Sequence, residues 1–350
     1  MKKNILLAAI LIALLFLLFK DRLPTSSVIG ENNFTVVISP FGTSTITGTW
    51  VGEVGPFMNA LSDKVHVGKD VPLCEDAYMG YISNQPVLVV ISGVGKIKTT
   101  TCLTSLLERY DGNIHEVILS GTSGISTNQG ARIGDICINS VAGNFDMQHY
   151  SSDLVGTNER KPAFWSGNTE ENSPELIQNG LVFELLSAAN SLTPAEPPEE
   201  ITQINSRYQG AYRSPVVFGM DECVEISGDL FWHDTNADIR AREIGSALLS
   251  TVRRKMTPQD TIIVTAMESI TGSEIVGMWN QAHATSIDFA YVRGASNFDH
   301  PPLLSDGTPA LSAGSSLESG YVDASIEFAA KRASEPVLKL FELREKLQEN

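Results

Sequence analysis

The sequence has few basic residues for its length. Of its 350 residues, 25 are Lys or Arg and 41 are Asp or Glu, which gives a net charge of -16 at neutral pH. A surface with this charge repels nucleic-acid backbones and anionic lipid headgroups. We therefore expect no nucleic-acid partner, and we interpret the acidity as a well-solvated surface.

Long hydrophobic runs are also scarce. The one that stands out extends from Ile5 to Phe19 and has charged residues on both sides. Its length lies between that of a signal-peptide core and that of a full membrane span. We expect residues 1–22 to be an export signal or a short membrane anchor, with the rest of the chain in the periplasm or outside the cell. A polytopic permease does not fit, because it needs several spans and the sequence offers at most one.

Cysteine and histidine are too few and too scattered for a metal centre. The cysteines are Cys74, Cys102, Cys137 and Cys223, and neither they nor the six histidines show metal-ligand spacing. We expect no metal and no organic cofactor. In an exported protein the cysteines can form disulfides, with three full connectivities open. Because Cys102 lies in a helical pattern and Cys137 in a strand pattern, we predict buried free thiols for these two.

The body of the chain alternates between strand and helix patterns. Apolar, β-branched runs at residues 34–39 and 86–92 predict buried strands, with a less regular region between them, and residues 97–109 predict a helix. Residues 322–348 predict one or two amphipathic helices, interrupted at their single proline. The alternation predicts one α/β domain over residues 34–348, built on a mixed or largely parallel sheet.

The segment from residue 261 to 302 looks like the floor of a site. Its pattern predicts a strand, a helix and a second strand, and such a unit usually places its two strands parallel. In parallel α/β sheets, ligands bind outside the carboxyl ends of the strands. Glu268 and residues 294–297 fall at such ends.

Two glycine-containing segments also follow predicted strands. Gly93 and Gly95 come after the strand at residues 86–92. The run from Ser120 to Gly124 follows another predicted strand and contains three hydroxyl side chains and two glycines. Backbone of this kind can approach a phosphate or a ribose, or form an anion- or hydroxyl-binding nest. Ordinary turns without a ligand explain both segments equally well.

In their order and spacing, these segments resemble the nucleoside phosphorylase superfamily. The resemblance is carried by Ser92-Gly93-Val94-Gly95-Lys96, Ser120-Gly121-Thr122-Ser123-Gly124, Ile226-Ser227-Gly228-Asp229-Leu230-Phe231, Met267-Glu268 and Arg293-Gly294-Ala295-Ser296-Asn297. The end of the last segment, with Pro301-Pro302, looks more like the purine nucleoside permease branch. The resemblance implies a three-layer α/β/α sandwich around a twisted mixed sheet, and we expect a homo-oligomer.

The resemblance also implies roles in binding a nucleoside. Phe231 would stack on the base, while Met267 and Glu268 would pack on the ribose and bind its hydroxyls. Thr122 would contact phosphate or its substitute, and Gly95 would allow close approach of the backbone to the ligand. Without the family pattern, a core phenylalanine and a capping glutamate are the simpler interpretations of Phe231 and Glu268.

Two residues are candidates for assisting the departure of the base. Asn297 occupies the position at which many members of the superfamily place an acidic general acid. An amide does not donate a proton outright, but it can hydrogen-bond the base. Asp299, two residues on, is a candidate substitute acid.

The sequence departs from the superfamily where a nucleophile would be activated. Hydrolytic members carry a glutamate just after the first strand and another two residues before the ribose-binding glutamate, whereas this chain has Ser39-Pro40-Phe41-Gly42 and Ala266. Phosphorolytic members carry arginines near the first and fourth strands, and neither Gly42-Thr43 nor Leu119 supplies one.

Two main hypotheses follow from this pattern. The favoured one is an enzyme that cleaves the N-glycosidic bond of a purine nucleoside, with phosphate as an optional co-substrate. The alternative is a nucleoside-binding component of a transport system that performs no chemistry. A storage or structural protein on the same scaffold is a third interpretation.

Overall fold

The computed structural model describes most of the chain beyond residue 32. The described residues are 33–125, 131–140, 142–144, 148–149, 161–162, 180–193, 196–205, 214–219, 222–227, 262–266, 269–298 and 319–349. Residues 34–350 form one compact unit, which does not include residues 1–33.

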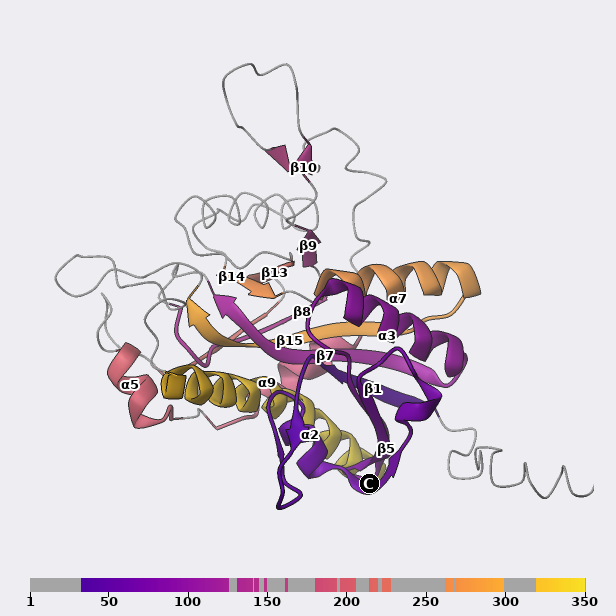
Figure 1. The fold of residues 1–350 in the computed structure, drawn as a ribbon, viewed down its shortest axis with the longest axis horizontal. Coiled ribbons are helices and arrows are strands. Elements are labelled where there is room, and N and C mark those ends of the chain that lie inside the picture. The colour runs from indigo at the N-terminus through magenta and orange to yellow at the C-terminus, as the bar shows by residue number, and fades with distance from the viewer. Residues whose placement is uncertain are drawn as a thin grey trace, which may run out of the picture. The chain divides into compact units, whose positions relative to one another are not determined.

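A mixed sheet of eleven strands forms its middle layer (Figure 1). The main path runs in the order β12-β8-β15-β7-β1-β6-β5-β4, and three further strands branch from the carboxyl end of β7. The main path consists of β1 (Phe34–Ser39), β4 (Ser62–His66), β5 (Asp76–Ile82), β6 (Gln85–Ile91), β7 (Ile114–Ile125), β8 (Ile136–Asn139), β12 (Val217–Phe218) and β15 (Asp288–Phe298). The branch consists of β9 (Ala142–Asn144), β13 (Cys223–Ser227) and β14 (Ile262–Ala266).

The centre of the sheet is parallel and covered on both faces. Strands β6, β1, β7 and β15 lie next to one another in that order, and all of these pairings are parallel. Every residue of β1 is buried, which agrees with its unbroken apolar sequence. Parallel pairing brings the carboxyl ends of these four strands to the same edge of the sheet, where the site is expected.

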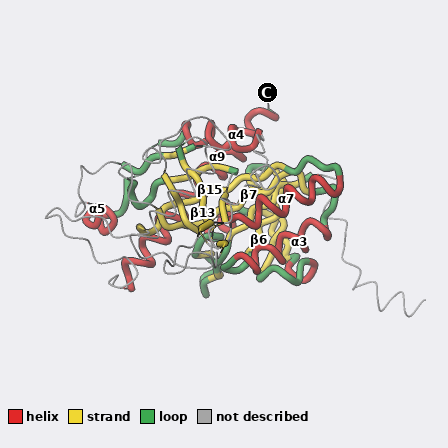
Figure 2. Tube along the Cα trace, turned by 90° about the horizontal axis from the view of Figure 1, so that it is seen from above, coloured by secondary structure: helices red, strands yellow, loops and turns green. Residues whose placement is uncertain are grey.

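Helices cover both faces of the sheet. On one face α3 (Lys96–Arg109) and α7 (Ser269–His283) lie side by side, as Figures 1 and 2 show. On the other face α2 (Gly55–Ala60), α4 (Gly180–Asn190) and α9 (Ser319–Gln348) pack together, and their apolar side chains share one core with the sheet. The predicted three-layer α/β/α sandwich around a mixed sheet is confirmed.

The remaining described elements are short. They are β2 (Thr43–Ser44), β3 (Trp50–Val51), the 3-10 turn η1 (Gly68–Asp70), β10 (Gln148–His149), β11 (Lys161–Pro162) and α5 (Glu199–Asn205). Among the described helices, none is both long enough and apolar enough to cross a membrane.

The predicted interruption of the C-terminal helix is wrong. Helix α9 continues without a break from residue 319 to 348 and contains Pro336 in its interior. Its residues Ala333, Val337 and Phe341 are buried against the core on both sides of the proline. Packing along the whole helix therefore outweighs the local cost of one missing backbone hydrogen bond.

The predicted parallel arrangement of the two strands around α7 is also wrong. Strand β14 pairs with the end of β7 in antiparallel fashion, whereas β15 pairs with β7 in parallel. The two strands are not neighbours in the sheet, because β7 lies between them. The helical and strand patterns were correct, but the pattern alone does not determine which strand each one pairs with.

The prediction of free thiols for Cys102 and Cys137 is wrong as well. Cys74 is bonded to Cys102, and Cys137 is bonded to Cys223. The first disulfide joins the segment before β5 to the buried face of α3, and the second joins β8 to the start of β13. A helix or strand pattern describes the local backbone only, so it gives no information on which second cysteine packs against the first.

Candidate functional site

The carboxyl ends of β7 and β15 lie side by side and bring two predicted site segments together. In the parallel register Thr122 is the partner of Gly294, and Gly124 is the partner of Asn297. The segments that the sequence suggested as loops are therefore the ends of strands. Ser296 Oγ lies 3.1 Å from the Ser123 carbonyl oxygen and 2.9 Å from Asn297 Oδ1, which holds the half-buried Asn297 amide in place.

A glutamate that the sequence reasoning missed reaches the same place. Glu53 is 3% exposed, and its Oε1 accepts hydrogen bonds from the backbone N–H of Thr122 and, at 2.6 Å, from the Thr122 hydroxyl. A carboxylate that accepts two donors in a buried site is held in one position. The run from Ser120 to Gly124 was considered as an anion-binding nest, and the anion beside Thr122 is a side chain of the protein itself.

A short hairpin explains why Glu53 was missed. Strands β2 and β3 pair with each other and separate β1 from Glu53 in the sequence. At the base of the hairpin the Val54 N–H donates to the Phe41 carbonyl oxygen at 3.1 Å, and Gly52 lies against Gly42. The chain therefore returns to the end of β1, so Glu53 lies just beyond this strand in space although the hairpin separates the two in the sequence. The interpretation that no glutamate follows the first strand is corrected.

A fully buried ion pair lies behind the strand ends. Arg293 and Glu225 are both 0% exposed, and Arg293 Nε is 3.2 Å from each carboxylate oxygen of Glu225. Two buried charges are tolerated only when they are paired and hydrogen-bonded. The pair joins β15 to β13, whose next residues lead into the predicted base-binding segment.

Gly121 shows how close Arg293 and Glu53 come to each other. A Cβ atom added to Gly121 would lie 2.8 Å from Arg293 Nη1 and 3.0 Å from the Glu53 Cδ and Oε1 atoms. Both charged side chains therefore approach the same point, which only a glycine leaves open. The guanidinium of Arg293 thus pairs with Glu225 of β13 and also lies near the carboxylate of Glu53 at the strand end.

Tyr291 adds a neutral contact to this group. Its Oη accepts a 2.8 Å hydrogen bond from the backbone N–H of Glu225. Complete burial, together with the nearby Glu225 carboxylate, raises the pKa of Tyr291 well above its ordinary value. The phenol is therefore neutral at pH 7, and it fixes β13 against β15 without adding charge.

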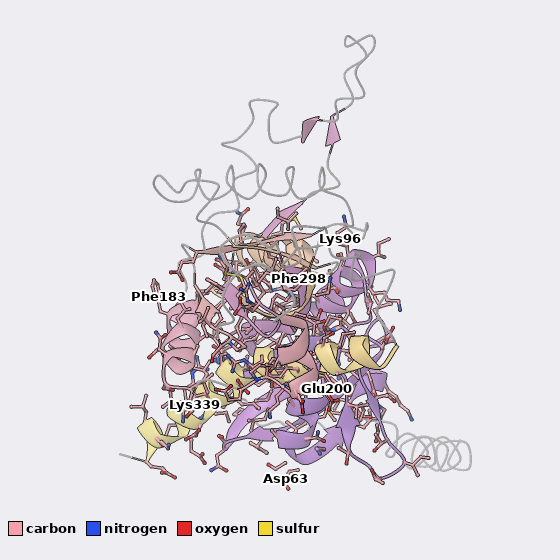
Figure 3. All side chains as sticks on the ribbon, turned by 90° about the vertical axis from the view of Figure 1, so that its left-hand side faces the viewer. Asp63, Lys96, Phe183, Glu200, Phe298 and Lys339 are labelled. Carbon is pink, nitrogen blue, oxygen red and sulfur yellow. A yellow bond between two sulfur atoms is a disulfide. The ribbon has the colours of Figure 1, made fainter. Side chains whose placement is uncertain are left out.

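The predicted glycine turn lies at the same edge of the sheet. Gly93 and Gly95 follow β6 and have φ angles of +84° and +108°, a region that favours glycine. Among the described residues, nothing lies within 4 Å of a Cβ placed on Gly95. Figure 3 shows Lys96, next to Gly95, and Phe298, next to Asn297, both toward the upper part of the described fold, away from Asp63 and Lys339.

Comparisons with known proteins bear on the family and the fold. Residues 45–195 match the family model of the phosphorylase superfamily. The resemblance to the nucleoside phosphorylase superfamily is confirmed. No curated protein matches the chain.

Solved structures with a similar fold include several nucleosidases of this superfamily. The 5'-methylthioadenosine/S-adenosylhomocysteine nucleosidase of Neisseria meningitidis, in complex with methylthio-immucillin-A, is 15% identical, with a TM-score of 0.50 over 88% of this chain and 99% of that one. The Streptococcus pneumoniae nucleosidase with a transition-state inhibitor is 14% identical, again with a TM-score of 0.50 over 88% and 99% of the two chains. Futalosine hydrolase of Helicobacter pylori is 14% identical, with a TM-score of 0.50 over 88% and 97%. At such identities the likeness shows the fold.

Four of the residues that the superfamily pattern singles out lie outside the described residues. These are Phe231, Met267, Glu268 and Asp299. The strands that lead to three of them end together, because Ser227 of β13 is the register partner of Ala266 of β14. The roles predicted for all seven site residues stay predictions. Among the described residues, no cluster of three or more His, Cys, Asp or Glu side chains could hold a metal ion.

Proposed function

We propose that the protein is a hydrolase that cleaves the N-glycosidic bond of a purine nucleoside. The observation that carries the proposal is the buried carboxylate of Glu53 on the backbone and hydroxyl of Thr122. A fixed carboxylate at the carboxyl edge of a parallel sheet is suited to accept a proton from an attacking water. The neighbouring solved structures are nucleosidases and a hydrolase, which supports this reaction class.

The position of Glu53 favours water over phosphate as the second substrate. Its Oε1 already takes the Thr122 donors that would otherwise be offered to an anion. A phosphate dianion in that place would meet a buried carboxylate at close range, and like charges in a low-dielectric site repel strongly. Phosphorolysis would therefore need Glu53 to leave its position.

The reaction proceeds through an oxocarbenium-like transition state at the ribose. Glu53 accepts the proton of the attacking water, and the nearby Arg293 balances the charge of this buried side chain. Glu268 holds the ribose hydroxyls and Phe231 stacks on the base. Asn297 hydrogen-bonds the departing base, and Asp299 supplies the proton that the base takes with it.

The protein works outside the reducing cytoplasm. Two disulfides in one domain support this location, because such bonds form and persist mainly in oxidising compartments. The basic and apolar residues at 1–22 support export or anchoring in a membrane. The comparisons give no support to the alternative in which the protein only carries nucleosides to a transporter.

The proposal is tested with the purified full chain. It is incubated with 5'-methylthioadenosine, adenosine and inosine, with and without phosphate, and free base is measured by chromatography. We expect release without phosphate. Release that requires phosphate contradicts hydrolysis, and no release together with saturable binding in calorimetry contradicts any enzymatic role.

A substitution then tests the assigned residue. Glu53→Gln keeps the shape of the side chain but removes the proton acceptor, so we expect kcat to fall roughly 100-fold or more with KM little changed. Glu327→Gln, on the exposed face of α9, is the matched control and should not change kcat. Equal rates for Glu53→Gln and the wild type contradict the role of Glu53.

A further inference from the structure

We propose that the disulfide between Cys137 and Cys223 is a positioning element of the site, which sets Glu225 on Arg293 and, through it, Arg293 beside Glu53. The inference rests on the proposed function and adds Cys137, Cys223 and Glu225 to it. It starts from the way in which four buried side chains close a ring across three strands.

The first two sides of the ring are set by strand geometry. Cys137 in β8 is the antiparallel register partner of Arg293 in β15, and directly opposed residues point to the same face of a sheet. Cys223 and Glu225 are two residues apart in β13, so they also share a face. The disulfide and the ion pair close the other two sides.

The ring matters because β13 is not a sheet neighbour of the strands that it contacts here. Among the described strands, β13 is hydrogen-bonded to β14 and β9 rather than to β8 or β15. Its position relative to the last two is set by side-chain links. Asn139 Nδ2 donates to the Cys223 carbonyl oxygen at 2.6 Å, the Glu225 N–H donates to Tyr291 Oη, and the disulfide is the one covalent link among those that the described residues show.

The consequence for the site follows from Arg293. Its Nε contacts Glu225, while its Nη1 approaches the point over Gly121 at which Glu53 also arrives. If β13 shifts, the Glu225 carboxylate shifts with it and the guanidinium follows, because an unpaired buried charge is costly. Reactions that depend on fixed charges lose rate steeply when those charges move by a fraction of an ångström.

A double variant with an internal control tests this. Cys137→Ala with Cys223→Ala removes the ring disulfide, and Cys74→Ala with Cys102→Ala removes the other one. Each is assayed as the full chain for base release from 5'-methylthioadenosine, well below the melting temperatures of both. We expect the first pair to lower kcat about tenfold or more with KM nearly unchanged, and the control pair to keep kcat within about threefold.

A double-mutant cycle separates positioning from a general loss of order. If the disulfide acts through Glu225, then removing it in a Glu225→Gln background lowers kcat by less than about threefold further. Glu225→Asp serves in the same cycle should Glu225→Gln fail to fold. An unchanged kcat in the cysteine variant, or effects that simply multiply in the cycle, would overturn the proposal.

The outcome is distinguishable from failure of the proposed function. When the wild type and the cysteine variant release base equally fast, the positioning role of the disulfide is contradicted, but the proposed hydrolysis is not. When the wild type releases no base, the proposed hydrolysis is contradicted. The same set of variants is then compared by the rate of amide hydrogen exchange in residues 223–227. Faster exchange that depends on Glu225 then supports the ring, and unchanged exchange overturns it.

Discussion

At the scale of single residues, the site depends on the space that Gly121 leaves. Its φ is not in the left-handed region, so the need for glycine comes from its neighbours rather than from its backbone. Arg293 and Glu53 fill the volume that a side chain would occupy, and both are buried. A methyl group there separates two charges that the fold has brought together.

Gly121→Ala is therefore expected to lower kcat about tenfold or more, because it displaces Arg293 and Glu53 from their shared position. Overpacking should also cost about 1–3 kcal/mol of unfolding free energy. Steady-state kinetics and urea denaturation measure the two effects. Gly180→Ala is the control, since a Cβ there would meet its nearest neighbour at 4.0 Å; equal kinetics for both variants would contradict the account.

The sequence located part of this site and missed the rest for physical reasons. Thr122, Asn297 and the turn at Gly93 could be proposed for this place because hydroxyl, amide and glycine residues after apolar strands are visible in the sequence; their roles stay predictions. Glu53 was not found, because a hairpin separates it from the strand that it follows in space. Glu225 carries no local signal in the sequence, because its partner Arg293 is 68 positions away along the chain.

At the scale of elements, the hairpin of β2 and β3 is an insertion that leaves the sheet undisturbed. Its tip residue Ile46 is fully exposed, and its base is closed by the bond between Val54 and Phe41. Trp50 packs against the core and makes an edge contact with Tyr78, and its backbone N–H and carbonyl oxygen are hydrogen-bonded to the Asn59 side chain. The position of Glu53 therefore depends on the base of the hairpin and not on its tip.

Replacing residues 45–49 by a two-residue Asn-Gly turn, which keeps Ser44 opposite Trp50, is expected to leave kcat within about threefold of the wild type, because the base of the hairpin and Thr122 still fix Glu53. The matched variant Trp50→Ala should lower the melting temperature, since it removes an aromatic contact with the core. A loss of activity in the shortened hairpin without a loss of stability would assign the tip a role in binding the substrate.

Elements with a strong pattern were predicted well, and elements without one were not. Strands β1 and β6 and helix α3 lie within one residue of their expected bounds, because their apolar spacing is unbroken. The region between β1 and β6 was called irregular, yet it contains α2, β4 and β5. Strand β5 contains Gly80 and an acidic first residue, and β4 is mostly polar and exposed throughout, so neither has the unbroken apolar sequence of a core strand.

At the scale of the whole molecule, a second buried charge cluster fastens the C-terminal helix to the sheet. Glu116 of β7 is bonded by the Thr35 hydroxyl at 2.5 Å and by Arg344 Nη1 and Nη2 of α9 at 2.5 and 3.0 Å. Arg344 also contacts Glu184 of α4 at 2.8 Å. Burial by itself raises the pKa of Glu116, but hydrogen bonds from His115, Arg344 and Thr35 and the charge of Arg344 outweigh it and lower the pKa to about 2.

This cluster predicts part of the acid sensitivity of the fold. Because the pKa of Glu116 is lower in the folded state than its ordinary 4.5, the ionised carboxylate stabilises the protein above that value, and the contribution is lost as the pH falls toward 2. Glu116→Gln should therefore lower the unfolding free energy by about 2–3 kcal/mol at pH 7 and flatten its decline between pH 5 and 2.

Urea denaturation at a series of pH values measures this effect. Glu342→Gln, on the exposed face of the same helix, is the control and should change little, because exposed ion pairs are screened by water. A Glu116→Gln variant whose stability falls with acid as steeply as that of the wild type would place the sensitive group elsewhere.

The place of β15 in the sheet also governs how the chain must fold. Strands β7 and β8 follow one another along the described chain, but β15, made more than 140 residues later, lies between them in the sheet. Until that late segment arrives, the nascent protein presents the apolar edge of β7 with unpaired backbone groups, a template for aggregation. Its non-local pairing also predicts slow folding. If the protein is exported, as proposed above, in unfolded form, β15 is already synthesised when the sheet forms, and this requirement is met.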